Sequence, residues 1–242
     1  MFDHVTIRVT DRAASERFYT TVLTSLGIDQ SYRTAAFSEW QDFSLAAADD
    51  SHPPTRRLHL AFAAPSREQV DAFWRAGIEA GYSDDGRPGP RPQYRSDYYG
   101  AFLVDPDGNS AEAVHHGALR RGGIIDHLWI RVADVTAARG FYETIAPHAA
   151  LRVERAAPDR VRVTTGSGSL SLVGGVPSEN LHLAFPTGDD TAVQRFHEAA
   201  TEAGYVSNGP PGERPQYHPG YYAAYVLDPD GNNVELVNHH RG

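Results

Sequence analysis

The chain repeats itself at a separation of 123 residues. The tetrapeptide RPQY occupies 91–94 and again 214–217, and the turn sequence DPDGN at 105–109 returns after the same interval. A chain of 242 residues is long enough for two domains of about 120 residues, each able to bury its own core. The repeat therefore predicts two like modules in tandem.

The repeat places the modules at 1–117 and 124–242, with an exposed linker rich in Gly and Arg at 118–123. Each module divides again into two segments of one plan. An alternating strand and an amphipathic helix open the segment, as at 3–27 and 57–81. The residues after each helix have space for three short strands. We therefore expect an α+β fold built from four βαβββ units.

Composition and charge exclude several classes of protein. The 40% hydrophobic and 22% charged content is that of a folded chain, and no stretch approaches the ~20 apolar residues that span a bilayer. No signal peptide is visible at the start, so we expect a cytoplasmic location. A net charge of −9 argues against nucleic acid as a partner, and the absence of cysteine excludes disulfides and thiolate metal ligands.

Six ionisable residues lie on strand faces that point away from the core. In HVTIRV at 4–9 every second residue from Val5 is apolar, so His4 points away from the face that packs on the helix. A carboxylate on such a strand costs several kcal/mol unless it is paired or bound to a cation. The same alternation sets apart five further residues: His59, Glu112, His127, His182 and Glu235.

The spacing of these six residues is the same in both modules. The separations are 55 and 53 residues in His4, His59 and Glu112, and again in His127, His182 and Glu235. Two imidazoles and a carboxylate suit Fe(II), Mn(II), Zn(II), Ni(II) or Co(II) and leave positions open for water and substrate. We therefore predict one divalent metal site per module, formed by these two triads. The alternatives are surface or hydrogen-bonded histidines, and an arginine such as Arg131 beside Glu235.

These motifs resemble the vicinal oxygen chelate superfamily, which includes glyoxalase I, fosfomycin-resistance proteins, bleomycin-binding proteins and type I extradiol dioxygenases. The resemblance covers nearly the whole chain, once per module. It rests on DHVTIRVTDRAASERFY, LHLAF and YYGAFLVDPDGNSAEAV in the first module, and on DHLWIRVADVTAARGFY, LHLAF and YYAAYVLDPDGNNVELV in the second. It implies that each pair of βαβββ units forms an eight-stranded open cup around a metal that binds two adjacent substrate oxygens.

The members of this superfamily fit the sequence unequally. Glyoxalase I generally has four protein ligands, whereas each module here offers three. Fosfomycin thiol transferases use a His-His-Glu set, but typically as dimers of single modules. The extradiol dioxygenase signature places a His and a Tyr before a D-P-x-G turn and the ligand Glu, as His218, Tyr225 and Glu235 stand here. Gln216 and Ala224 break the flanking positions of that signature.

The second module carries more groups with catalytic chemistry than the first. Where it has His218 and Tyr225, the first module has Arg95 and Phe102. Trp129, on the His127 face, could form a wall for a planar substrate. If only one module is catalytic, we therefore expect it to be the second.

Two further tyrosines are candidates for catalysis. Tyr99 and Tyr222 each lie 13 positions before a predicted ligand glutamate. Their phenols could donate a hydrogen bond to a bound substrate oxygen. Packing at the rim of the cup is the alternative.

The sequence therefore predicts a divalent-metal-dependent enzyme of the glyoxalase and dioxygenase superfamily, acting on a small substrate that chelates the metal through vicinal oxygens. One alternative is an extradiol, catechol-cleaving dioxygenase that uses Fe(II) in the second module. Another is a protein that binds an antibiotic or metabolite and confers resistance. The expected partner is a small molecule, not nucleic acid or a membrane, and a homodimer is one option for assembly.

Overall fold

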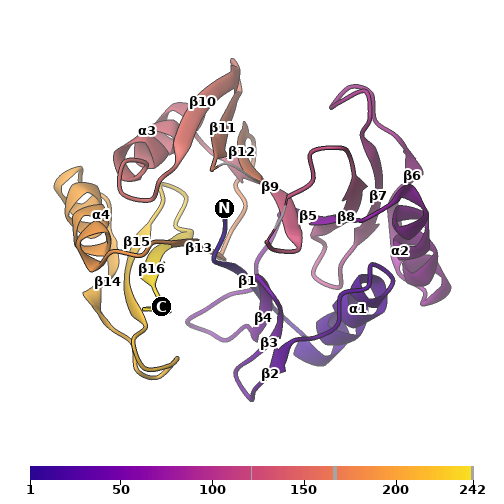
Figure 1. The fold of residues 1–242 in the computed structure, drawn as a ribbon, viewed down its shortest axis with the longest axis horizontal. Coiled ribbons are helices and arrows are strands. Elements are labelled where there is room, and N and C mark those ends of the chain that lie inside the picture. The colour runs from indigo at the N-terminus through magenta and orange to yellow at the C-terminus, as the bar shows by residue number, and fades with distance from the viewer. Residues whose placement is uncertain (121, 166–167, 241–242) are drawn as a thin grey trace. The chain divides into compact units, whose positions relative to one another are not determined.

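The computed structural model describes residues 1–120, 122–165 and 168–240. The order strand, helix and three strands occurs four times among them (Figure 1), which confirms the four predicted βαβββ units. The first repeat contains β1 (His4–Val9), α1 (Arg12–Thr24), β2 (Tyr32–Arg33), β3 (Phe37–Trp40), β4 (Phe43–Ala47), β5 (His59–Ala63), α2 (Arg67–Glu79), β6 (Ser83–Pro90), β7 (Tyr99–Val104) and β8 (Ser110–His115). The second repeat contains β9 (Ile125–Val132), α3 (Val135–Ile145), β10 (Arg152–Ala157), β11 (Arg160–Thr164), β12 (Ser169–Gly174), β13 (Leu181–Pro186), α4 (Asp190–Glu202), β14 (Ser207–Glu213), β15 (Tyr222–Leu227) and β16 (Asn233–Asn238).

The strands form two eight-stranded mixed sheets. One sheet has the order β14-β15-β16-β13-β1-β4-β3-β2, and the other has the order β10-β11-β12-β9-β5-β8-β7-β6. The pairs β13 with β16 and β5 with β8 are parallel, while β15 with β16 and β7 with β8 are antiparallel. The predicted α+β fold of two tandem modules with open eight-stranded sheets is confirmed. The predicted composition of each sheet is corrected, because each sheet combines one βαβββ unit from each repeat and not the two units of one module.

The chain divides into two compact units. We call Thr6–Trp129 the first unit, and Met1–Val5 together with Ile130–Gly242 the second unit. Strands β1 and β9 cross these limits, so the start of each belongs to the unit that holds most of the other repeat. The module boundaries at 1–117 and 124–242 stay a prediction about the repeat, and residue 121 of the predicted linker lies outside the described residues.

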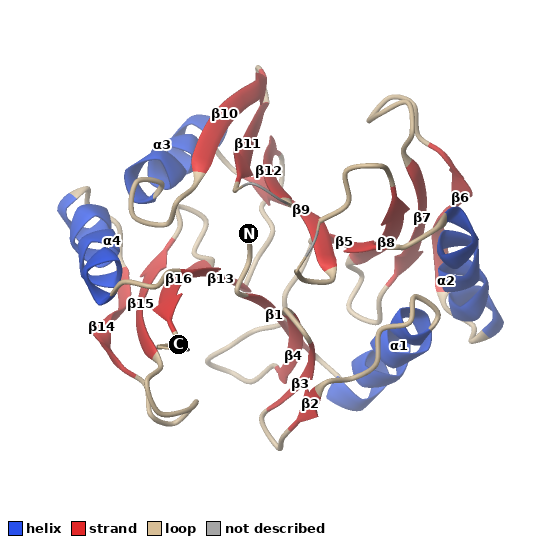
Figure 2. Ribbon diagram, viewed as in Figure 1, coloured by secondary structure: helices blue, strands red, loops and turns tan. Residues whose placement is uncertain are grey.

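Each helix begins at a side-chain cap and packs its buried stripe on strands of the same βαβββ unit. Figure 2 shows the helices beside these strands. Asp11 accepts a hydrogen bond from the Ala14 N–H at 3.0 Å, and Asp134 caps α3 in the same way. Such caps satisfy N–H groups that have no partner within the helix. Among the described residues, no helix is long and apolar enough to cross a membrane. The buried stripe of α1 comprises Ser15, Phe18, Tyr19, Val22 and Leu23.

The DPDGN turns fix the strands that carry the glutamates. The Asp105 carboxylate accepts hydrogen bonds from the N–H groups of Asp107 and Asn109 at 2.9 and 2.8 Å. Asn109 in turn accepts from the Leu58 N–H at 3.1 Å, so the turn is tied to the start of β5. Gly108 has a φ of +85°, a conformation that glycine adopts without strain. The turn therefore sets the register of β8 against β5.

A buried ion pair holds the start of β9 in the first unit. The guanidinium of Arg120 is 2% exposed, donates to the Asp42 carboxylate and also donates to the Ile125 carbonyl at 2.9 Å. Asp42 also accepts from the Ile124 N–H at 2.8 Å. These bonds anchor the segment that leads directly into Asp126 and His127.

Replacing Arg120 by Ala should lower the free energy of unfolding by about 3–5 kcal/mol, because Asp42 would remain buried without its cation. The matched control is Arg139→Ala, since Arg139 and Glu143 form an exposed pair on α3 worth less than about 1 kcal/mol. Urea denaturation followed by tryptophan fluorescence measures both. Equal shifts for the two variants would contradict a structural role for the Arg120 pair.

Candidate metal centres

Each unit brings three ligand-type side chains together. The first cluster, in the first unit, consists of His59 on β5, Glu112 on β8 and His127 on β9. The Glu112 Oε2 atom lies 2.9 Å from Nε2 of His59 and 3.5 Å from Nε2 of His127. All three ligand atoms lie within 4.8 Å of one another.

The second cluster, in the second unit, repeats this arrangement. It consists of His4 on β1, His182 on β13 and Glu235 on β16. The Glu235 Oε2 atom lies 2.9 Å from Nε2 of His182 and 3.6 Å from Nε2 of His4, and the two Nε2 atoms are 3.0 Å apart. Two histidines therefore lie beside Glu235, which meets the expectation that a carboxylate on such a strand has a compensating partner.

Strand register explains why three distant residues meet. In the first unit β5 is flanked by β8 and β9, and Ala61 is opposite Glu112 on one side and His127 on the other. Ala61 follows His59 by two places, so both lie on one face of the sheet. Its methyl group leaves room for the side chains on either side. Ala184 takes the same place beside Glu235, which gives the repeated LHLAF motif a physical reason.

The predicted grouping of the ligands is corrected by the structure. The sequence placed His4 with His59 and Glu112, but His4 lies in the second cluster and His127 in the first. Strand pairing is the cause, because β5 pairs with β9 and β13 is followed in the sheet by β1. Equal spacings along the chain reveal equivalent positions, but they do not reveal which strand lies beside which.

A tyrosine donates a hydrogen bond to the glutamate of each cluster. Tyr98 donates to Oε1 of Glu112 at 2.6 Å, and Tyr221 donates to Oε1 of Glu235 at 2.6 Å. Burial alone would raise the pKa of Glu112, but His127 and His59 outweigh it and lower that pKa to about 2. Burial and the nearby glutamate raise the pKa of Tyr98 well above its usual value, so its phenol stays a donor. One carboxylate oxygen is thus occupied, and the other faces the histidines.

An aspartate lies behind one histidine of each cluster. Asp126 Oδ2 is 2.9 Å from Nδ1 of His127, and Asp3 Oδ1 is 2.9 Å from Nδ1 of His4. A carboxylate beside Nδ1 accepts a hydrogen bond from Nδ1–H and leaves the Nε2 lone pair of the neutral ring toward the cluster. Burial would lower the pKa of His127, but Asp126 and Glu112 raise it to about 9.

Each of these aspartates is itself held by a further histidine. His116 Nε2 lies 3.2 Å from Asp126, and His239 Nε2 lies 2.9 Å from Asp3. Sequence reasoning missed these outer partners. The dipeptide Asp-His, which begins both DHVTIRV and DHLWIRV, was the available signal.

Tyr225 lies at the second cluster. It is the cross-strand partner of Glu235, and its ring centroid is 6.3 Å from that of His182. Its hydroxyl oxygen is buried and has no hydrogen-bond partner among the described residues. Burial, and then the charge of Glu235, raise the pKa of Tyr225 above its usual value. A neutral phenol therefore faces the cluster.

His218 does not reach the second cluster directly. Its Nε2 atom lies 2.8 Å from Nδ1 of His239, which in turn contacts Asp3 behind His4. Its Nδ1 atom lies 2.8 Å from the Pro219 carbonyl. The predicted catalytic histidine is thus separated from the ligands by two intervening side chains.

Tyr99 and Tyr222 point away from the clusters, which corrects their predicted catalytic role. Tyr99 donates to Asp71 of α2 at 2.8 Å, and Tyr222 accepts from Gln194 of α4 at 3.1 Å. Neighbouring residues on a strand point to opposite faces. The first tyrosine of each YY pair, at 98 and 221, therefore faces the glutamate. Strand alternation indicates this, because Tyr221 lies four residues before Tyr225 and so shares its face.

Trp129 belongs to the first cluster rather than beside Tyr225. Its ring lies edge-on to His59 at 6.1 Å and to Tyr94 at 5.8 Å. Phe102 lies 5.8 Å from His59 on the same cluster. The sequence placed Trp129 and Tyr225 in the same cup. In the structure Trp129 lies beside the first cluster and Tyr225 beside the second.

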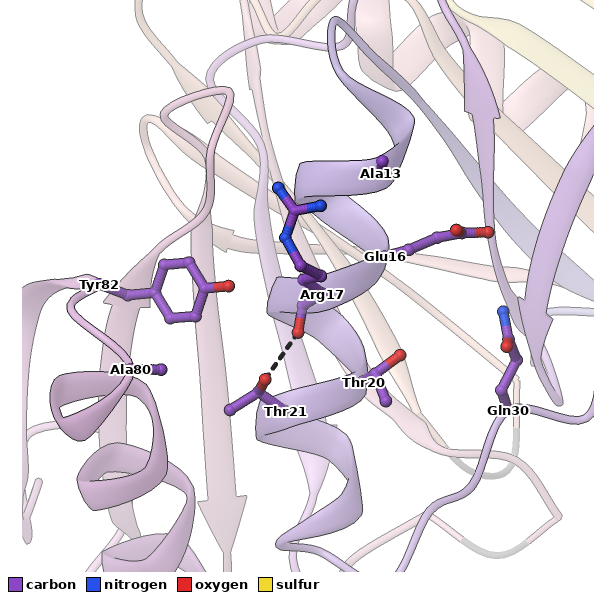
Figure 3. Close-up of a pocket in the computed structure, with 8 residues that line it drawn as sticks. All are labelled: Ala13, Glu16, Arg17, Thr20, Thr21, Gln30, Ala80 and Tyr82. Atoms are coloured by element: carbon purple, nitrogen blue, oxygen red, sulfur yellow. Dashed lines mark hydrogen bonds between the residues drawn. The ribbon is translucent and has the colours of Figure 1, made fainter.

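A hollow beside α1 in the first unit is separate from both clusters (Figure 3). The Thr21 hydroxyl in it donates to the Arg17 carbonyl of the same helix at 2.7 Å, and Glu16 is paired with Arg33. No residue of either cluster lines it, so we do not assign the site there. Its lining residues are Ala13, Glu16, Arg17, Thr20, Thr21, Gln30, Ala80 and Tyr82.

Solved structures share this fold at low sequence identity. Glyoxalase I from Zea mays matches with a TM-score of 0.72 and 20% identity, covering 98% of this chain and 92% of that chain. A protein from Bacillus subtilis subsp. subtilis strain 168 with a provisional dioxygenase assignment matches with a TM-score of 0.68 and 14% identity, covering 100% of this chain and 86% of that chain. These two likenesses show the fold alone.

Two further matches each cover about half of the chain. A glyoxalase/bleomycin resistance protein from Albidiferax ferrireducens T118 is 36% identical, covering 48% of this chain and 99% of that chain, with a TM-score of 0.42. No curated protein sequence matches the chain. Residues 1–113 match the model of the Glyoxalase/Bleomycin resistance protein/Dioxygenase superfamily. The second repeat shares the motifs of this matched segment, and the first repeat, residues 1–113, belongs to that superfamily.

Proposed function

We propose that the chain is a divalent-metal-dependent enzyme whose small substrate chelates the metal through two adjacent oxygens, and that each cluster holds one metal ion. The convergence of two imidazole Nε2 atoms and one buried carboxylate oxygen, all within 4.8 Å, carries this proposal. Such a set suits Fe(II), Mn(II), Zn(II), Ni(II) or Co(II).

The donor chemistry supports a cation at each cluster. Asp126 accepts a hydrogen bond from Nδ1–H of His127, so the Nε2 lone pair points toward an anionic carboxylate that is only 1% exposed. A lone pair beside a carboxylate needs either a proton or a metal ion between them. Tyr98 keeps one oxygen of Glu112 occupied, so the other is directed at the same point. Three protein ligands leave further positions for substrate.

The second cluster is the better candidate for catalysis. When bound, the metal would supply Lewis-acid chemistry, and iron would also support reactions with dioxygen. Tyr225 offers a neutral hydroxyl that can donate a hydrogen bond, or a proton, to a substrate oxygen. The Arg214 guanidinium lies 5.5 Å from the centre of its ring, and a Cβ on Gly209 would come within 2.7 Å of that ring. These contacts hold the phenol in place, whereas the first cluster has Phe102 at the equivalent position.

Extradiol cleavage of a catechol is the second candidate reaction. Tyr225 beside a cluster of two histidines and a glutamate favours it, because that ligand set serves non-haem Fe(II) oxygenases. The indirect position of His218 weakens it. An isomerase or lyase reaction, in keeping with the fold shared with glyoxalase I, requires the same ligands. A small-molecule partner, a cytoplasmic location and the exclusion of nucleic acid at a net charge of −9 belong to the same proposal.

Protein purified without a histidine tag and reconstituted anaerobically should bind two metal ions per chain. Glu112→Ala and Glu235→Ala should each remove about one, because each truncates a different cluster. Elemental analysis measures the stoichiometry, and metal at a hundredfold excess over Kd should stabilise the fold by about 2.7 kcal/mol. Absence of metal from reconstituted wild-type protein would refute the proposal.

Tyr225→Phe should lower turnover by roughly 10- to 10,000-fold with little loss of metal, because it removes a proton donor and not a ligand. Tyr222→Phe is the matched control, since its hydroxyl bonds to α4, and it should leave turnover unchanged. Oxygen uptake with catechols and conversion of 2-oxoaldehyde adducts, using iron- or manganese-loaded protein, provide the assays.

The regrouped ligands also reverse an expectation from the sequence. His4→Ala should abolish this turnover, while His127→Ala should preserve most of it, because Tyr225 lies with His4. The opposite pattern would show that catalysis belongs to the first cluster.

Metal uptake at the first cluster should depend on pH. His127 has a pKa of about 9 without metal, so below that pH the ion must displace a proton. In a Glu235→Ala background, affinity should rise by up to about tenfold per pH unit toward pH 9. The same raised pKa stabilises the metal-free fold below about pH 6.5, and this contribution is lost as pH rises to 9.

Chelator competition measures this affinity, and urea denaturation measures the stability. Asp126→Asn removes a group that raises the pKa of His127, so it should shift both dependences to lower pH. An affinity that stays flat between pH 6.5 and 9 would contradict the assignment of His127 as a ligand that must lose a proton.

A further inference from the structure

The two clusters differ in what lies behind their second histidine. In the first cluster, His59 Nδ1 is 3.2 Å from the Ser110 hydroxyl, which donates to the Asp85 carboxylate at 2.6 Å. In the second cluster, His182 Nδ1 is 2.7 Å from the Asn233 amide, whose oxygen accepts from Asn208 at 3.0 Å. Positions 85 and 208 are equivalent in the repeat, as are 110 and 233. One chain of hydrogen bonds therefore ends in a carboxylate and the other in a neutral amide.

This difference affects which ring nitrogen of the histidine carries the proton, and so whether the Nε2 lone pair faces the cluster. An ionised carboxylate only accepts hydrogen bonds, so the Ser110 hydroxyl donates to Asp85 and its oxygen can accept from Nδ1–H of His59. The Nε2 lone pair of His59 then faces the cluster. An amide both donates and accepts, so Asn208 and Asn233 allow either direction. As placed, the Asn233 amide nitrogen faces His182 Nδ1, an arrangement that puts the ring proton on Nε2.

Burial of the outer partners points the same way. The side chains of Asp126 and His116, behind His127, are 7% and 9% exposed. Their equivalents Asp3 and His239, behind His4, are 17% and 18% exposed. An aspartate shielded from water acts more strongly on a nearby cation. The first cluster thus has one additional carboxylate, Asp85. The aspartate present behind both clusters is also more buried in the first, as Asp126, than in the second, as Asp3.

We propose that the clusters are unequal metal sites, the first binding its ion more tightly, and that the residues at 85 and 208 set much of the difference. The proposal rests on metal binding by both clusters as argued above. The first ion then stays bound while the ion beside Tyr225 exchanges. Asp85 acts as a positioning residue, because it orients His59 through Ser110 without touching the metal.

Titration of the metal-free full-length chain with Zn²⁺, in competition with a chromophoric chelator, tests this inequality. Two steps should appear, separated by about tenfold or more in Kd. Glu112→Ala should remove the tight step and Glu235→Ala the weak one. If Glu235→Ala removes the tight step instead, the order of the sites is wrong.

Exchange of the two equivalent residues tests the cause. Asp85→Asn should weaken the tight step by about tenfold, the low end expected for an outer partner, because Asp85 is exposed. Asn208→Asp should strengthen the weak step. Asp84→Asn is the charge control: it removes the neighbouring carboxylate, which bonds to Trp74, and should change Kd by less than about twofold.

The outcomes separate this inference from the function on which it rests. Two equal steps in the wild type, or equal effects of Asp84→Asn and Asp85→Asn, would overturn the inference and leave the proposed metal sites intact. No Zn²⁺ binding at all would overturn both. Thermal unfolding of each metal-free variant, compared with wild type, shows whether the variant is folded, so that loss of a binding step is not mistaken for unfolding.

Discussion

A buried carboxylate in the middle of a parallel strand pair is the constraint around which each site is built. Glu112 and Glu235 are both 1% exposed, and an ionised group in such a place is strongly unfavourable without compensation. The fold supplies that compensation from three directions: a phenol on one oxygen and two imidazoles on the other. Removing any one of these weakens the compensation of a charge that is shielded from water. This explains why the same set of one glutamate, one tyrosine and two histidines occurs at both sites.

The residues of the sites were largely predictable, because strand alternation is a local property. His59 and Glu112 stand out in the sequence as polar positions on apolar strands, and the repeat supplies a second example of each. The four βαβββ units followed from the same periodicity and the helix stripes. The alternation would also have separated Tyr98 from Tyr99 had it been extended through β7.

The grouping of ligands was not predictable in the same way. Whether β5 pairs with β1 or with β9 depends on long-range hydrogen bonding, and both strands present a histidine at the same position. Outer partners such as Asp85 were also beyond reach, since an exposed aspartate on an irregular strand has no distinguishing pattern. Local chemistry identifies the candidates, and tertiary pairing decides which of them act together.

The use of β1 and β9 by units that hold most of the opposite repeat makes the two repeats chemically interdependent. A fragment ending at residue 120 would contain His59 and Glu112 but would lack the histidine that completes their cluster. The remainder of the chain would contain His182 and Glu235 with the same deficiency. The two halves are thus similar in sequence, but neither contains a complete cluster by itself. The covalent link keeps the complementary half always present at a fixed ratio, so site assembly is independent of protein concentration.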